Sequence, residues 1–282
     1  MRPASLGVIG LGAIGGSLAW QSRLAGVPRV IGYSLKPAEG VQALRASAIT
    51  ELADSAAGAA REAELVVLAV PPDPTLELLA SLGPVLQSGA VLTDVCSVKA
   101  PIVKQALVSG LGDRFAGGHP LAGTHEAGFV AARPDRFRGC VVYVCETGSP
   151  AGYRAAATVA RFWEEVLEAS PVSIEAEAHD RQLAWTSHLP QAIAYALAKV
   201  LSDQGLAGVS FGSGARDTTR LAASSPELWV EVLRYNAGAV GAALERTEEQ
   251  IAELRRLISS GDADALKAYL EAARAFRQGI ER

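Results

Sequence analysis

Short apolar runs alternate with longer amphipathic stretches through the first part of the chain. The short runs are rich in Val, Ile and Leu, and the stretches between them carry apolar residues at helical spacing. Apolar strands that alternate with helices are typical of a parallel sheet covered by helices on both faces. We expect strands at 6–10, 30–33, 65–70, 91–93, 114–116, 140–145 and 172–174, and helices at 14–25, 40–48, 74–83 and 98–109.

The pattern changes after residue 174. Strong helix formers then dominate, and they predict helices at 178–200, 226–255 and 262–278. We therefore expect a first domain at 1–174 and a helical domain at 175–282. Because these Ala-rich, apolar helices exceed what one small domain can bury, we also expect a homodimer formed through the helical domain.

The composition is that of a globular protein with a sizeable core. The chain has 282 residues, of which 49% are hydrophobic, enough for one or two domains. Its net charge is −4 and no basic block stands out, so nucleic acid is not an expected partner. Its apolar runs fall well short of the ~20 residues of a membrane span, and we read no signal peptide before the first strand. We expect a cytoplasmic protein that does not bind membranes.

The three cysteines point to the same compartment. An odd number argues against a disulfide framework and for reducing surroundings. Cys140 and Cys145 are five residues apart on an expected strand, so their side chains face opposite sides and do not readily pair. No spacing of ligand residues indicates zinc, and we expect no metal cofactor.

A glycine-rich turn follows the first expected strand. Gly10, Gly12 and Gly15 form the pattern GxGxxG, with Ala13 and Ile14 at the start of the next helix. The three glycines allow a tight turn, close approach of a pyrophosphate and close packing of helix on strand, while the helix N-terminus attracts the anion. This context predicts a dinucleotide site in a Rossmann-type, doubly wound α/β domain, followed by the all-α domain.

The second expected strand ends without the acid that usually binds the ribose 2′-hydroxyl of NAD. Ser34 occupies that position, and Lys36 follows it. A small hydroxyl beside a cation suits a 2′-phosphate, so the cofactor is expected to be NAD(P)⁺ with NADP⁺ slightly favoured. The alternative is that Lys36 is simply solvated and the site accepts both dinucleotides.

Further blocks in the chain carry polar and ionisable residues. Together with the glycine turn they resemble the prephenate/arogenate dehydrogenase family, in order and over almost the whole chain. The resemblance implies an NAD(P)-dependent oxidoreductase of tyrosine biosynthesis. Its reaction would be the oxidative decarboxylation of prephenate to 4-hydroxyphenylpyruvate, or of arogenate to tyrosine. The blocks are DVCSVK from Asp94, GGHPLAGTH from Gly117, HD from His179 with SHLPQ from Ser187, and RDTTR from Arg216.

His119 is the expected catalytic base. It follows an expected strand and lies in what reads as a glycine-bounded loop, at the edge of the sheet where ligands bind. Histidine can take a proton near neutral pH. The resemblance implies that His119 accepts the substrate hydroxyl proton and that Ser97 assists it. Ser97 has a plainer alternative, as the N-cap of the helix from residue 98.

Two arginines four residues apart can share a helical face. Prephenate is a dianion and needs a local cation, and the resemblance implies that Arg220 binds its ring carboxylate. Arg216 is expected to be a structural partner of an acid. The resemblance also implies substrate contacts for Thr124, His125 and Gln191. Many relatives have a second His where this chain has Gln191, which leaves the choice of substrate open.

His179 and His188 fall on an expected helix and are expected to be buried, hydrogen-bonded structural residues.

Two rival functions remain. A β-hydroxyacid dehydrogenase or imine reductase has the same architecture, but enzymes of the first type use a Lys early in the helical domain, and none precedes Lys199 there. A non-catalytic dinucleotide sensor is the other rival, against which the intact Ser97, His119 and Arg220 argue.

Overall fold

The structure is a computed structural model that describes residues 2–123, 126–206 and 209–280. The chain divides into two compact units, Met1–Asn236 and Ala237–Arg282. The first unit holds the sheet and the helices around it, and the second is a helical hairpin. The expected boundary after residue 174, placed where the strand pattern gives way to helices, stays a prediction.

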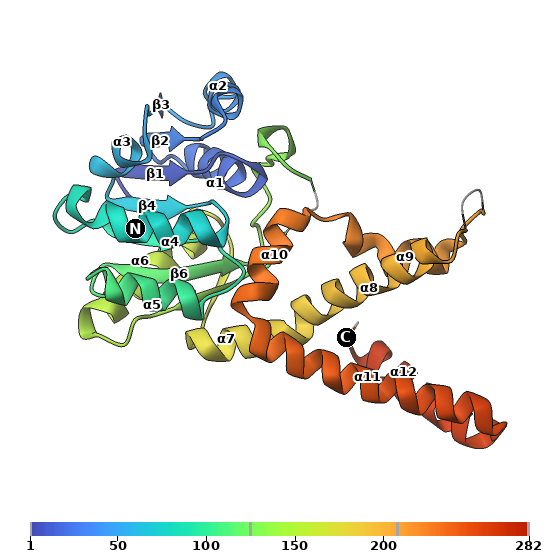
Figure 1. The fold of residues 1–282 in the computed structure, drawn as a ribbon. Helices are drawn as coiled ribbons and strands as arrows, with labels where there is room; N and C mark the ends of the chain where they lie inside the picture. Colours follow the sequence, from blue (N-terminus) through green and yellow to red (C-terminus); the bar gives the residue numbers. More distant parts are fainter. Residues whose placement is uncertain (1, 124–125, 207–208, 281–282) are drawn as a thin grey trace. The chain divides into compact units, whose positions relative to one another are not determined.

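An eight-stranded sheet forms the centre of the first unit (Figure 1). Its strand order is β3-β2-β1-β4-β5-β6-β7-β8, and neighbouring strands are parallel except for the antiparallel pair β6–β7. The expected α/β class is therefore confirmed, with the correction that the sheet is mixed because its last two strands run opposite to the others. The strands are β1 (Ser5–Ile9), β2 (Arg29–Tyr33), β3 (Glu51–Leu52), β4 (Leu65–Leu68), β5 (Val91–Asp94), β6 (Phe115–Pro120), β7 (Val141–Cys145) and β8 (Ser170–Ser173).

Each face of the sheet carries its own apolar core. Along β4, Leu65 and Val67 belong to one core, and Val66 and Leu68 to the other. This alternation follows from the two-residue period of a strand. Helices α1 and α6 contribute to the first core and α3, α4 and α5 to the second. The helices of this part are α1 (Ala13–Leu24), α2 (Pro37–Arg45), α3 (Ala56–Arg61), α4 (Pro72–Leu82), α5 (Ala100–Val108) and α6 (Pro150–Glu165).

The helix expected at 178–200 is interrupted. It forms α7 (Ala176–Leu183), a π-helical turn at Ala184–His188, and α8 (Leu189–Asp203). The Leu189 N–H bonds the carbonyl of Ala184, five residues back. A single π turn inside a helix is frequent at functional sites, and the proline that follows it lacks the N–H that a regular helix would use. This turn brings His188 to the start of α8. Two more helices, α9 (Ser213–Thr219) and α10 (Pro226–Tyr235), complete the first unit.

The second unit consists of α11 (Ala237–Ser260) and α12 (Ala263–Ile280). The single helix expected at 226–255 is wrong, because α10 ends at Tyr235 and its C-cap residue, Asn236, leaves the helical region with a φ of −112° and a ψ of 25°. Within its described residues α12 has no buried side chain. Leu270, Phe276 and Ile280 are all more than half exposed.

The sequence pattern did not predict β3, α3 or α6. None of the helices in the described parts of the chain is long and apolar enough to cross a membrane. Cys96, Cys140 and Cys145 are free thiols.

Candidate active site

His119 lies inside a strand and not in a loop, which corrects the expectation. It is the fifth residue of β6, where it pairs with Tyr143 of β7. Strand β6 pairs with β5 only through Phe115 and Ala116, after which the two strands separate. His119 therefore sits at the carboxyl edge of the parallel part of the sheet, as expected for a ligand-binding position.

A buried ion pair fills the gap between β5 and β6. Asp94 and Lys99 contact each other directly, and both side chains are fully buried. The Gly118 N–H donates to Asp94 Oδ1 at 3.2 Å, and its carbonyl accepts from Lys99 Nζ at 2.8 Å. A Cβ on Gly118 would lie 2.5 Å from the Asp94 carbonyl oxygen, so only glycine fits. The ion pair thus replaces one step of the sheet ladder and fixes the backbone next to His119.

The ring of His119 contacts a second histidine. Its Nδ1 lies 2.8 Å from Nε2 of His179, which is fully buried on α7. His179 Nδ1 lies 2.8 Å from Oδ1 of Asp180. Asp180 in turn accepts the backbone N–H groups of Lys99 at 2.7 Å and Ala100 at 2.9 Å, at the N-terminus of α5. Two N–H donors at a helix N-terminus stabilise a carboxylate.

This chain of hydrogen bonds assigns the protons. A carboxylate only accepts, so His179 Nδ1 carries a hydrogen and donates to Asp180. In neutral His179 the other nitrogen, Nε2, then accepts from Nδ1 of His119. His119 is left with an unprotonated Nε2, and this assignment follows from the network. The site therefore presents a base whose tautomer two other side chains select.

Burial lowers the pKa of His119 well below 6.5, and repulsion from His179, Lys99 and His188 acts in the same direction. Burial also lowers the pKa of His179, although the hydrogen bond to Asp180 opposes the shift. Because burial disfavours the charged form of an imidazole, His119 is neutral near pH 7. A neutral imidazole is the form that accepts a proton.

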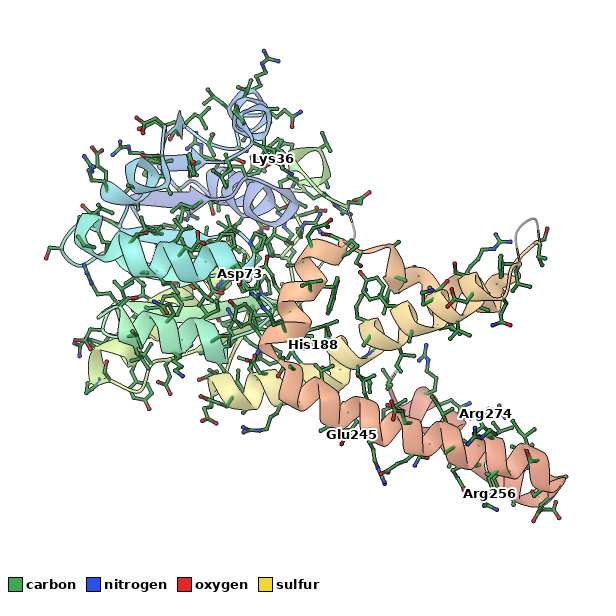
Figure 2. All side chains as sticks on the ribbon, in the orientation of Figure 1. Lys36, Asp73, His188, Glu245, Arg256 and Arg274 are labelled. Carbon is green, nitrogen blue, oxygen red and sulfur yellow. The ribbon has the colours of Figure 1, made fainter. Side chains whose placement is uncertain are left out.

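His188 completes the buried group and is the N-cap residue of α8 (Figure 2). Its Nδ1 accepts from Asn236 Nδ2 at 3.0 Å, and the same amide donates to the Asp180 carbonyl at 2.7 Å. Burial lowers the pKa of His188 to about 4. The charge of Asp180 opposes this shift, and His188 Nε2 has no hydrogen-bond partner among the described residues. The expectation of a buried, hydrogen-bonded His188 is confirmed.

Ser97 lies on the loop between β5 and α5 and is half-buried. Its alternative role as a helix N-cap is wrong, because α5 begins at Ala100 and its N-cap residue is Lys99. Ser97 does not bond His119 Nδ1, since His179 occupies that atom. Its action on the substrate hydroxyl stays a prediction.

A separate turn carries the predicted substrate arginine. Arg220 opens a short 3₁₀ turn, Arg220–Ala223, and is exposed. Two side chains of α8 hold this turn: Gln191 Nε2 donates to the Leu221 carbonyl at 2.6 Å, and Tyr195 Oη donates to the Ser224 carbonyl at 2.8 Å. Gln191 is buried, so its evident contact is structural, while direct contact with substrate stays a prediction. No hydrogen bond joins Arg220 to the histidine group among the described residues.

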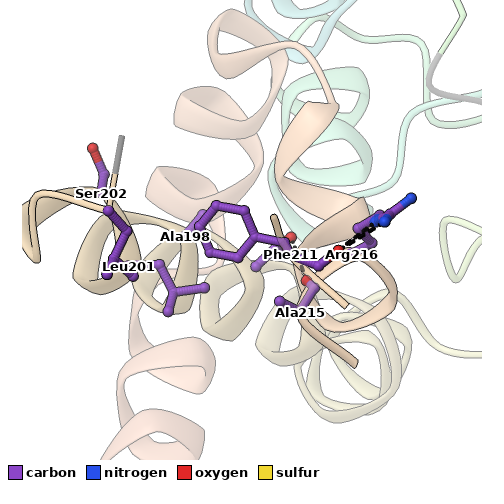
Figure 3. Close-up of a pocket in the computed structure, with 8 residues that line it drawn as sticks. Ala198, Leu201, Ser202, Phe211, Ala215 and Arg216 are labelled. Carbon is purple, nitrogen blue, oxygen red and sulfur yellow. Dashed lines mark hydrogen bonds between the residues drawn. The ribbon is translucent and has the colours of Figure 1, made fainter. Parts of the chain in front are cut away.

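Arg216 differs from its expectation. It was expected to pair with an acid, but its Nε and Nη2 both donate to the Phe211 carbonyl, at 3.0 and 2.7 Å. Arg216 and Phe211 also line a cavity of about 440 Å³ between α8 and α9 (Figure 3). None of the predicted catalytic or substrate residues lines it. Thr124 and His125 lie outside the described residues.

Helix α10 is fastened to the sheet domain by Asp73, at the start of α4 (Figure 2). The Asp73 carboxylate accepts from Arg234 Nη2 at 2.6 and 2.7 Å and from the Tyr235 hydroxyl. The Asp73 N–H donates to Glu231 at 2.7 Å. The Tyr235 hydrogen bond and then Arg234 lower the pKa of Asp73. These bonds hold α10, and with it Asn236, at the carboxyl edge of the sheet.

The glycine turn fits a dinucleotide. Gly10 has a φ of +98°, and its N–H donates to the Tyr33 carbonyl at 2.8 Å. A Cβ on Gly12 would meet no atom within 4 Å, so this turn is open to a ligand. Helix α1 starts at Ala13 with no side-chain cap and no acid in its first turn. Its N–H groups, including those of Ala13 and Ile14, are therefore available to an anion.

A carboxylate missed by the sequence pattern lies at the end of β2. Ser34 Oγ donates to Glu39 Oε2 at 2.8 Å, and Lys36 Nζ lies 3.8 Å from Glu39 Oε1. The pattern missed Glu39 because it belongs to the first turn of α2 and not to the strand end. The roles of Asp94 and Lys99 were also missed, although both belong to the DVCSVK block. The pair His179 and Asp180, adjacent in the sequence, was the available signal for the side chains that orient His119.

Comparison with known proteins matches two family models. The model described as prephenate dehydrogenase, nucleotide-binding domain, matches residues 19–170. The model described as prephenate dehydrogenase, dimerization domain, matches residues 175–272. The chain belongs to the prephenate dehydrogenase family. The family recognised from its motifs is thereby confirmed.

Individual members of the family are similar over nearly the full chain. Prephenate dehydrogenase of Bacillus subtilis is 31% identical over 96% of this chain and 74% of its own. The Aquifex aeolicus prephenate dehydrogenase structure, which contains hydroxyphenyl propionate and NAD⁺, has a TM-score of 0.89 at 29% identity and covers 98% of both chains. The Synechocystis arogenate dehydrogenase structure has a TM-score of 0.80 at 30% identity, covering 98% of this chain and 99% of the other.

Proposed function

We propose that this protein oxidises and decarboxylates prephenate to 4-hydroxyphenylpyruvate with NAD(P)⁺ as oxidant. One observation carries the proposal: the His119–His179–Asp180 chain leaves a buried imidazole with a free Nε2 at the carboxyl edge of the sheet. A dehydrogenase that oxidises a secondary alcohol needs such a base at the hydroxyl. A non-catalytic sensor has no need of a buried base with a selected tautomer.

The reaction consists of a proton transfer, a hydride transfer and the loss of carbon dioxide. His119 Nε2 accepts the proton of the ring hydroxyl as the carbon–oxygen double bond forms. Bound NAD(P)⁺ supplies the acceptor for the hydride that leaves the carbon bearing this hydroxyl. The ring carboxylate leaves as carbon dioxide, and the electrons of its bond to the ring complete the aromatic system. The phenolate oxygen that results takes back the proton from His119.

His179 and Asp180 keep the proton-accepting nitrogen of His119 turned to the substrate, and they stabilise the imidazolium that forms. Ser97 assists at the hydroxyl, and Arg220 pairs with the ring carboxylate through its planar guanidinium. Gln191 supports Arg220 indirectly, through the Leu221 carbonyl. Thr124 and His125 are proposed substrate contacts from their place in the motif.

Gly10, Gly12, Ala13, Ile14 and Gly15 would hold the pyrophosphate at the N-terminus of α1. The sequence favoured NADP⁺ slightly, through Ser34 and Lys36, but the nearby Glu39 alters the balance of charge there. A homodimer formed through the helical domain and a cytoplasmic location are parts of the proposal. The location is supported by the three free thiols.

Arogenate is the second candidate substrate. It differs from prephenate by an amino group in place of the keto group, so the ring chemistry is the same. The similarity to the Synechocystis arogenate dehydrogenase is about as extensive as that to the Aquifex enzyme. The keto or amino group belongs to the substrate's side chain and not to the ring carbon that bears the hydroxyl, so the His119 chain serves both substrates equally.

One assay tests the proposal. Purified protein is mixed with prephenate or arogenate and with NAD⁺ or NADP⁺, and reduced cofactor is followed by its absorbance. We expect turnover with prephenate that exceeds turnover with arogenate. Turnover with arogenate alone would favour the second candidate, and absence of turnover with both would contradict the proposed function. A β-hydroxyacid in the same assay serves as the negative substrate.

A further inference from the structure

Ser34 and Glu39 form a polar pair beside the glycine turn. Ser34 directly follows β2, and Glu39 lies in the first turn of α2. Ser34 Oγ donates to Glu39 Oε2 at 2.8 Å and accepts the Lys36 N–H at 3.2 Å. A carboxylate therefore stands at the end of β2, although the strand itself does not end in an acid.

The position of the pair relative to the dinucleotide turn follows from the sheet register. Strands β1 and β2 are parallel with Ile9 opposite Tyr33, and the Gly10 N–H donates to the Tyr33 carbonyl at 2.8 Å. Ser34 is thus the neighbour of the glycine turn on the adjacent strand. In dinucleotide folds the ribose of the adenosine half reaches this position.

The exposed fractions of the Lys36 and Glu39 side chains decide which of the two charges dominates beside Ser34. The Glu39 side chain is only 14% exposed, whereas Lys36 is 77% exposed and stands 3.8 Å away. The solvated ammonium is screened by water and salt, whereas the more enclosed carboxylate is screened less. A Cβ on Gly128 would lie 3.6 Å from Glu39 Oε1, so the 128 segment also borders the carboxylate.

A carboxylate has lone pairs for more than one donor. With Ser34 bonded to Oε2, Glu39 can still accept a ribose hydroxyl, as an acid at the strand end does in NAD sites. The same charge repels a 2′-phosphate. Glu39, an acid in the next helix, thus takes the role of the acid that is absent from the end of β2.

We propose that Glu39, positioned by Ser34, is the residue that binds the ribose 2′-hydroxyl and makes this protein prefer NAD⁺ over NADP⁺. The inference rests on the proposed function only for the class of cofactor. It reverses the slight preference for NADP⁺ that Ser34 and Lys36 predict when they are considered alone.

The test measures cofactor binding without substrate. Dissociation constants of NAD⁺ and NADP⁺ are determined by isothermal titration calorimetry for the wild type and for Glu39→Gln. We expect the wild type to bind NAD⁺ about tenfold or more tightly than NADP⁺, and Glu39→Gln to reduce that ratio by about fivefold or more. Gln keeps the size and an acceptor for Ser34, and an unchanged thermal midpoint would show that the variant is folded.

Two further variants sharpen the result. Glu77→Gln removes the same charge from an exposed position on α4 and should leave the ratio within about twofold of wild type. Lys36→Met tests the alternative that Lys36 attracts the 2′-phosphate of NADP⁺. This variant too should change the ratio of the two dissociation constants by less than about twofold. A wild type that prefers NADP⁺, a ratio unmoved by Glu39→Gln, or a large change in Lys36→Met would overturn the proposal.

The outcome is separable from that of the substrate assay. Preference for NAD⁺ that depends on Glu39 supports the inference even where prephenate is not turned over. Turnover of prephenate with a preference for NADP⁺ supports the proposed function and overturns the inference. Failure of the wild type to bind either dinucleotide overturns both.

Discussion

Nδ1 of His119 lies 2.8 Å from Nε2 of His179, although the two residues are 60 positions apart. One ring stands on β6 and the other on α7, the first helix after the sheet. The contact joins His119, through His179, to the Asp180 carboxylate, which also accepts hydrogen bonds from two N–H groups at the N-terminus of α5. The nitrogen proposed as the base is thus oriented by α7, which the chain reaches long after β6, and α7 is itself held by the N-terminus of α5, which precedes β6.

Replacement of the base should abolish most of the turnover. We predict that His119→Asn lowers kcat by about 10²- to 10⁴-fold, the range for loss of a general base. The dissociation constant of the cofactor should stay near that of wild type, because His119 is not part of the glycine turn. Steady-state kinetics and calorimetry measure the two quantities. Wild-type turnover in this variant would remove His119 from the mechanism.

The second histidine should act through the first. We predict that His179→Leu lowers kcat by about tenfold or more, since one hydrogen bond of about 1.4 kcal/mol corresponds to tenfold in rate. His179→Gln keeps an acceptor for His119 Nδ1 and should restore part of the rate. If His179 were purely structural, both variants would lose activity alike and the pH profile would stay unchanged. If His179 acts as the acceptor for His119, its loss in His179→Leu should shift the acidic limb of the pH profile.

The pH profile should reflect a neutral base. Burial holds the pKa of His119 well below 6.5, so the protonated, inactive form accumulates only at a pH well below that value. Activity should therefore be retained as pH falls to 6.5 and be lost at lower pH. The profile of kcat/KM reports the free enzyme and is the quantity to measure. An acidic limb centred above pH 6.5 would contradict the buried, neutral His119.

The arginine on the 3₁₀ turn should govern substrate affinity. We predict that Arg220→Ala raises KM for prephenate by about 10- to 100-fold, as expected for a lost hydrogen bond to a charged group. Cofactor affinity should change far less. Arg220→Lys should recover only part of the loss, because an ammonium does not form the paired bonds of a guanidinium. Should KM stay unchanged in both variants, the carboxylate must bind elsewhere.

The helical domain should pair two chains. Helix α12 buries none of its described side chains, and Leu270, Phe276 and Ile280 are exposed apolar residues. Burial of such residues against a second copy would remove them from water. Light scattering at micromolar protein should give about twice the monomer mass of 29.3 kDa. A mass near one chain would count against the homodimer, and Leu270→Glu should weaken a dimer formed here.

The local pattern was sufficient for most of the elements. Strand and helix periodicities depend on neighbouring residues, so β1, β2, α1 and α12 could be predicted nearly as observed. Breaks inside helices were harder to predict from the sequence, because the π turn before Leu189 and the break between α10 and α11 at Asn236 depend on tertiary contacts. Asn236 leaves the helix where its side chain bonds His188 and the Asp180 carbonyl.

His119, Arg220 and the glycines of the dinucleotide turn could be proposed from the sequence alone, because each belongs to a contiguous motif. The partners of these residues could not be named in this way. His179 meets His119 and Glu39 meets Ser34 only because the folded backbone brings separate elements within hydrogen-bond distance. A hydrogen bond depends on distance and direction in space, and neither is encoded in the spacing along the chain. The tertiary structure therefore decided which nitrogen of His119 is free to act as the proposed base and which carboxylate stands beside Ser34.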